Sequence, residues 1–132
     1  MSSAPQPQAE APHLARALAA LAKEVTGLQG AVVASTDGFA LAQLGRQADT
    51  VDRLAAMTSS MLALAGALGR ELRFGELDTL ILDAEHGKVL MLAIPGDPVR
   101  LLMVACDTRG VIGTVLWHAK QCVRAIADAP PQ

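Results

Sequence analysis

The run LAAMTSSMLALAGALG, residues 54–69, contains no charged side chain and lies between Asp52-Arg53 and Arg70-Glu71. As a helix it would be roughly 24 Å long, which is shorter than the ~20 apolar residues of a membrane span require. A helix this apolar must be covered on more than one side, but a small domain has only one core, which covers only one side of the helix. The uncovered side therefore predicts a protein partner.

An angular reading at about 100° per residue divides this helix into two stripes. The first is expected to pack on a sheet, and it consists of Leu54, Thr58, Met61, Ala65, Leu68 and Leu72. The second, which we call the seam, consists of Arg53, Met57, Ser60, Leu64, Ala67 and Glu71.

The seam is self-complementary about a two-fold axis near residue 62. Antiparallel copies would place Arg53 opposite the partner's Glu71, Met57 opposite Ala67, and Ser60 opposite Leu64. The hypothesis is an isologous homodimer, and the alternative is that a loop of the same chain covers the seam.

The segments before the long helix predict a helix and a hairpin. Apolar residues at helical spacing between Leu14 and Val25 predict an amphipathic helix from about His13 to Gly27. The pair Asp37-Gly38 separates two apolar runs, 31–35 and 39–43, which is a strong hairpin signal.

The segments after the hairpin predict a long helix, a meander and a final helix. Asp49 or Thr50 is expected to cap the long helix, which runs to about Leu72. Strands over 77–84, 89–94 and 99–106 are joined by loops short enough to force antiparallel pairing. A helix over 111–128 follows an expected cap at Asp107-Thr108.

The last two strands are apolar on both faces, which an antiparallel sheet needs only when layers cover both sides. The predicted class is α+β in α/β/α layers. A five-stranded antiparallel sheet would have the long helix on one face and the two terminal helices on the other. Residues 13–128 form the expected domain, and residues 1–12 and 129–132 are expected to be disordered tails.

Composition excludes several function classes. The 11 Lys and Arg against 13 Asp and Glu give a net charge of −2 without a basic run, which argues against nucleic acid. Two scattered cysteines and no signal segment predict a reduced, cytoplasmic protein. His118 and Cys122 have metal-ligand spacing, but no other cluster completes a site, so neither metal nor cofactor is expected.

Catalytic motifs are missing as well. The sequence has no GxxxxGK[ST], no GxGxxG opening a helix and no GxSxG. Carboxylates such as Asp107 lie at strand ends and turns, where capping of backbone N–H groups is expected. Trp117 points away from the sheet, either to pack on the first helix or to anchor a partner. We expect a noncatalytic protein.

Three segments together resemble the roadblock/dynein light chain superfamily, in its bacterial type. They are VTGLQGAVVASTDGFALA (25–42), RLAAMTSSMLALAGALGRELRFGELDTLIL (53–82) and GVIGTVL (110–116). The resemblance covers about residues 14–126. It implies a profilin-like roadblock fold and homodimers in which long helices and third strands meet across the two-fold axis, with Thr79 and Ile81 at that strand edge.

The resemblance also implies a function. Bacterial members regulate Ras-like small GTPases, and eukaryotic members act in dynein or signalling scaffolds. The expected function is a noncatalytic homodimeric regulator or scaffold that binds such a GTPase and modulates its nucleotide cycle. Expected partner contacts are Arg53, Arg70, Arg73 and Trp117, by location only. A small-ligand sensor, a purely structural scaffold of a signalling or motor complex, and a hydrolase are the alternatives.

Overall fold

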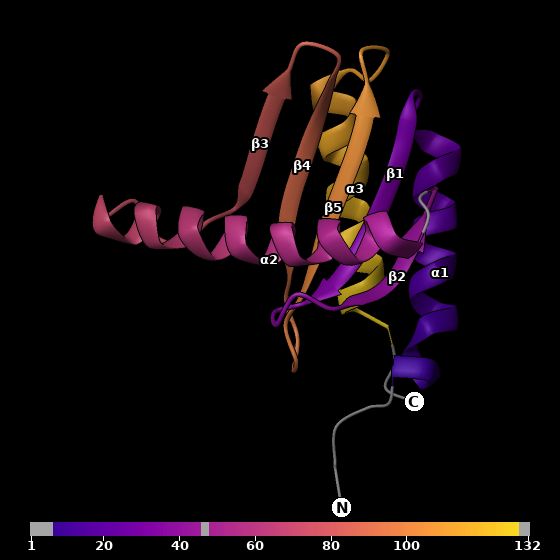
Figure 1. Cartoon of the computed structure of the whole chain (residues 1–132), viewed down its shortest axis with the longest axis horizontal. Helices are drawn as coiled ribbons and strands as arrows, with labels where there is room; N and C mark the ends of the chain where they lie inside the picture. Colours follow the sequence, from indigo (N-terminus) through magenta and orange to yellow (C-terminus); the bar gives the residue numbers. More distant parts are fainter. Residues whose placement is uncertain (1–6, 46–47, 130–132) are drawn as a thin grey trace, which may run out of the picture.

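The computed structural model describes residues 7–45 and 48–129. Its elements follow the expected order of helix, hairpin, long helix, three-strand meander and helix (Figure 1). They are α1 (Pro7–Glu24), β1 (Leu28–Ser35), β2 (Ala40–Leu44), α2 (Ala48–Glu71), β3 (Thr79–Ala84), β4 (Gly87–Ile94), β5 (Arg100–Asp107) and α3 (Ile112–Ala127).

The five strands form one antiparallel sheet in the order β2-β1-β5-β4-β3. The predicted hairpin is confirmed, because the Gly38 N–H donates to the Ser35 carbonyl at 3.0 Å and β1 pairs with β2. The predicted meander of β3, β4 and β5 is confirmed too. Within the described protomer, β2 and β3 are the two edges of the sheet.

Helices cover both faces of this sheet, as the doubly apolar strands predict. On one face α1 and α3 bury Leu14, Leu18 and Ile126 against Leu90 and Leu102. On the opposite face lies α2, whose buried residues contact a second set of strand residues, Val32, Met91, Leu101 and Met103 among them. The predicted α+β class with α/β/α layers is confirmed.

Three helix starts differ from their predictions. α1 begins at Pro7 rather than near His13, because a proline is tolerated at the first helical position and the Ala and Glu residues that follow it favour a helix. Pro12 lies inside this helix. α2 begins at Ala48, so Asp49 and Thr50 lie inside the helix instead of capping it.

The third difference concerns α3. Val111 occupies its N-cap position without a side-chain hydrogen bond, and the Asp107 carboxylate binds Gln29 and Arg109 instead of the helix. The expected cap at Asp107-Thr108 is therefore wrong. Residues 1–6, 46–47 and 130–132 lie outside the described residues, so the expected tails stay predictions there.

α2 lies across the strands rather than along them, and its C-terminal end extends past the β3 edge (Figure 1). It contacts β1, β2, β4 and β5. Within residues 7–45 and 48–129, none of the helices has the length and apolar content that a membrane crossing requires.

Candidate interaction surface

The side of α2 that faces the sheet differs from the predicted stripe. Val51, Ala55, Thr58 and Leu62 are buried on the sheet, and the Thr58 hydroxyl donates to the Leu54 carbonyl at 2.8 Å. Of the predicted sheet-facing residues, Leu68 and Leu72 are exposed instead, so their assignment to the core is wrong. Val51, Ala55 and Leu62 belong to one buried cluster with Met91 and Met103 of the sheet.

Large apolar side chains project outward from α2 at helical spacing. Leu64 is 74% exposed, Leu68 60% and Met57 55%. We call this set the outer ridge. It consists of the exposed Met57, Leu64 and Leu68, the half-buried Met61, and the exposed Leu72 directly after the end of α2. An apolar row of this size on a protein surface is typical of an interaction site.

The predicted seam lies on the same outward side of the helix. All six residues of the seam are exposed, so no loop among the described residues covers it. The alternative that a loop of the same chain covers the seam is therefore wrong. The six residues are Arg53, Met57, Ser60, Leu64, Ala67 and Glu71. The seam and the outer ridge share Met57 and Leu64. The outer ridge therefore lies closer to β3 than the seam does.

The outer ridge continues into a groove toward β3. This groove has a volume of about 510 Å³ and is lined mainly by apolar side chains, including Leu64, Leu68 and Leu80. Leu80 pairs with Met91 and therefore projects on the α2 side of the sheet. The helix and the edge strand together form one continuous apolar surface.

At the β3 edge, Thr79 and Ile81 project on the face of the sheet that α1 and α3 cover. Their pairing partners, Leu92 and Leu90, belong to the core under α1 and α3. Ile81 is exposed and Thr79 is half-buried. Sequence reasoning missed Leu68, Leu72 and Leu80 as surface residues, since it could not know how α2 is rotated on the sheet.

The predicted partner-binding arginines in and after α2 are also exposed, but they do not lie close together in one protomer. Arg53 and Arg70 are separated by roughly 25 Å along the helix. Arg73 follows the end of α2 with a φ of 60°, and the next N–H, of Phe74, donates to the Gly69 carbonyl at 2.8 Å. After this C-terminal turn, Phe74 is exposed.

Residues 14–105 match the sequence model of the Roadblock/LC7 domain family. The chain belongs to this family. No curated protein matches the sequence.

Solved roadblock structures have the same fold at low sequence identity. The roadblock domain from Streptomyces avermitilis aligns with a TM-score of 0.80 at 16% identity, over 86% of this chain and 94% of that one. The gliding protein MglB from Thermus thermophilus has a TM-score of 0.80 at 21% identity, over 91% and 90%. An MglB in a tetrameric arrangement has a TM-score of 0.80 at 22% identity, over 91% and 89%.

Trp117 of this roadblock domain is not packed away on α1. It is 59% exposed, and its ring meets the His118 ring edge-on, with centroids 5.0 Å apart and an interplanar angle of 89°. The expectation that it packs on the first helix is therefore wrong, because it lies opposite the buried residues of α3. Its alternative role as a partner anchor stays a prediction.

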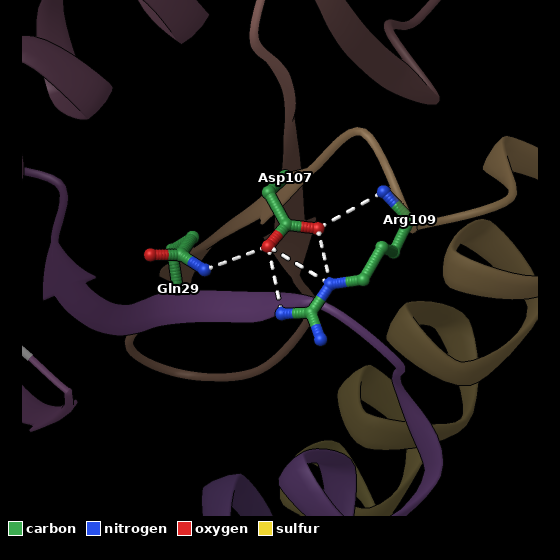
Figure 2. Close-up of polar contacts among 3 residues, drawn as sticks. All are labelled: Gln29, Asp107 and Arg109. Atoms are coloured by element: carbon green, nitrogen blue, oxygen red, sulfur yellow. Dashed lines mark hydrogen bonds and ion pairs between the residues drawn. The ribbon is translucent and has the colours of Figure 1, made fainter.

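Gln29 of the roadblock motif Gly27-Leu28-Gln29-Gly30 forms a polar cluster with Asp107 and Arg109 (Figure 2). The pairing of β1 with β5 shifts register at Gln29, and the Gln29 side chain donates to Asp107 Oδ2 at 3.0 Å. Arg109 donates to the same carboxylate from its backbone N–H at 2.9 Å and from Nη2 at 2.8 Å. These bonds join the start of β1 to the loop before α3.

Hydrogen bonds from Arg109 hold the pKa of the Asp107 carboxyl below its usual value of 3.8. A carboxylate that stays ionised and is held by three donor groups serves a structural purpose better than proton transfer. Asp107 was expected to accept a hydrogen bond from a backbone N–H group. It does so from the N–H of Arg109 and not from an N–H at the start of α3.

Cys106 and Cys122 are both free and buried. Burial raises the pKa of the Cys122 thiol to about 11, and its Sγ lies 3.7 Å from the Ala17 carbonyl oxygen as a donor. Among the described side chains, no three His, Cys, Asp or Glu residues gather closely enough to hold a metal ion. Both cysteines pack as small apolar side chains.

Proposed function

We propose that this roadblock domain is a noncatalytic homodimer that binds a Ras-like small GTPase and either modulates its nucleotide cycle or acts as its scaffold. The observation that carries the proposal is the outer ridge of α2, which continues across the groove onto the free edge of β3. A surface of this kind needs a protein partner, and a second copy of the chain supplies a matching one.

Burial of the outer ridge would provide most of the dimer affinity. Moving a leucine from water into an interface stabilises it by about 1.5–3 kcal/mol, and Leu64 and Leu68 are both largely exposed in the protomer. Arg53 and the partner's Glu71 would lie at the ends of the seam. Exposed ion pairs add only about 0–1 kcal/mol each, but they disfavour the parallel arrangement.

The β3 edge supports the same symmetry. Its strand, TLILDA, has no lysine or proline to block pairing, and its outer edge is open in the protomer. Antiparallel pairing of β3 with its copy, at Thr79 and Ile81, would extend the sheet across the two-fold axis. The tetrameric MglB is a precedent for self-association of this fold.

The GTPase assignment rests on the family. We infer that the dimer presents a platform on which the GTPase docks, with Arg53, Arg70 and Arg73 of both copies as its polar contacts. The chain itself lacks the P-loop motif that cradles nucleotide phosphates. It would act on a nucleotide bound by its partner, in the cytoplasm.

The dimer is tested by Leu64→Arg with light scattering after size exclusion. We expect the wild type to be a dimer and the variant a folded monomer, because each copy would place a charged arginine in the interface where Leu64 packs opposite the partner's Ser60. Ala56→Arg is the matched control, since Ala56 is exposed on α2 but lies outside the ridge. A monomeric wild type, or a variant that stays dimeric, contradicts the proposal.

GTPase binding is tested by a pull-down with the Ras-like GTPase encoded nearest to this chain, loaded with GDP or with a GTP analogue. We expect binding that depends on the nucleotide, and a changed hydrolysis or exchange rate if the domain is a regulator. An unchanged rate with retained binding indicates a scaffold. Equal binding to both states, or none, removes the proposed mechanism.

A further inference from the structure

The face of the sheet on which α2 packs is only partly covered by that helix. The cluster of buried residues beneath α2 includes Met91 and, at its margin, Leu80, but not Leu82. Leu82 pairs with Val89, and Val89 pairs with Ala105, so these three residues form the next row on the same face. We call them the open row, because Leu82 is 39% exposed and the other two are half-buried.

A groove of about 610 Å³ is lined by all three residues of the open row. Two of the charged side chains that line it already have partners. Lys88 Nζ lies 3.4 Å from Asp83 Oδ1, and the Asp107 carboxylate is bound by Arg109. What the groove offers to an occupant is therefore its apolar floor rather than a charge.

The C-terminal end of α2 is apolar and extends past the edge of its own sheet (Figure 1). Leu62 is the last residue of this helix in the buried cluster. The nine residues that follow it, 63–71, measure roughly 13 Å along the helix. Directly after them, Leu72 is 53% and Phe74 80% exposed. These two side chains have no apolar cover within the described protomer that matches their size.

We propose that the end of α2 from one copy, with Leu72 and Phe74, covers the open row of the other copy. This inference rests on the proposed two-fold pairing of β3. Antiparallel pairing at that edge puts the axis perpendicular to the sheet, so α2 and the groove of the two copies share one face. A segment that projects past the edge of one copy then lies over the sheet of the other.

The two-fold axis also places this segment beside the other copy's α2 and not on top of it. Each α2 covers the Leu80 end of the sheet face, and rotation about the axis exchanges the two ends of β3. The partner's helix end therefore lies on the side of Leu82. Leu80 and Leu82 are neighbours on one side of β3, so the groove continues the apolar surface formed with the outer ridge.

A second copy fits this groove better than an unrelated protein, because one chain contains both halves of the contact. The open row and the projecting apolar end lie at the same edge of the sheet, and the strand between them has no outer neighbour in the described protomer. Each copy would complete the apolar layer over the sheet of the other.

The two phenylalanines of the chain provide a matched pair of variants. Phe74→Ala should weaken dimerisation about tenfold, measured by light scattering on dilution, because it removes a ring that the second copy buries. Phe39 is also exposed, at 68%, but lies at the turn between β1 and β2. Phe39→Ala should leave dimerisation unchanged, and both variants should fold.

Cysteine cross-linking then locates the contact. Phe74→Cys and Leu82→Cys proteins, one of them carrying a size tag, are mixed and treated with a short bismaleimide. The wild type serves as the blank, since its two cysteines are buried. We expect a product that joins one protein of each kind. Phe39→Cys in place of Phe74→Cys should give no such product.

The outcomes separate this inference from the dimer itself. A dimer that gives no cross-link between positions 74 and 82, or that forms equally well with Phe74→Ala, would overturn the inference and leave the dimer in place. A monomeric wild type would overturn both.

Discussion

At the residue scale, Asp107 connects two parts of the chain that lie far apart in the sequence. Its backbone N–H donates to the Gly27 carbonyl at 2.8 Å, and its carboxylate accepts from Gln29 and Arg109. The family motif around Gly27 is therefore explained by packing and hydrogen bonding at this corner of the sheet.

Asp107→Asn should lower the melting temperature at neutral pH, because it removes the charge that Arg109 binds. The folded pKa of Asp107 lies below 3.8, so the ionised form stabilises the fold fully above that value and less as the pH falls through the folded pKa. Thermal melts of both proteins between pH 7 and pH 2 should converge at the acid end. A constant difference at every pH would contradict this role.

Gly27→Ala should destabilise the domain by about 1–3 kcal/mol in urea titrations. Gly27 has a φ of 80°, and an added Cβ would overlap Asp107 Oδ1. Gly113→Ala is the matched control, because that glycine lies in α3 with open space around it. The control should be neutral or stabilising, and two equal losses would show that the Asp107 corner is not special.

At the element scale, the rotation of α2 determines which of its side chains are available to a partner. The helix crosses the strands and places Ala55, Thr58 and Leu62 on the sheet, so that Leu64 and Leu68 project into solvent. A helix whose apolar residues extend around most of its circumference has several possible buried faces. The crossing angle and the side chains of the sheet select among them.

Two neighbouring alanines test this rotation. Ala55→Lys should cost more than about 3 kcal/mol of unfolding free energy, because Ala55 is fully buried and a charge there has no partner. Ala56→Lys should change it by no more than about 0.5 kcal/mol, since Ala56 is exposed. Chemical denaturation gives both values, and similar losses would mean that α2 packs with a different face.

At the scale of the whole molecule, the sheet has helices on both faces but is open at β3, where the outer ridge of α2 also ends. Assembly through this side would leave α3 and Trp117 free on the other.

If the proposed dimer forms, stability should depend on protein concentration. The wild-type melting temperature should rise as concentration increases, because mass action favours the folded dimer. Leu68→Arg should remove this dependence and still give a folded protein by circular dichroism, as Leu68 is largely exposed. An unfolded Leu68→Arg variant would instead place Leu68 in the core.

Four features could be predicted from the sequence alone: the element order, the hairpin at Asp37-Gly38, the meander and the three layers. These follow from local turn chemistry and from strands that are apolar on both faces, and both signals are contained in short segments. The outward position of Met57 and Leu64 could be predicted in the same way, as residues of one flank of a regular helix.

Three features became visible only in the folded molecule. They are the rotation of α2, the position of Leu68 and Leu80 on one apolar surface, and the cluster of Gln29, Asp107 and Arg109. The physical reason is that each depends on side chains from distant segments meeting in space. Helical periodicity gives the relative angles of residues on α2, but their absolute direction depends on how the helix packs against strand residues such as Met91 and Met103.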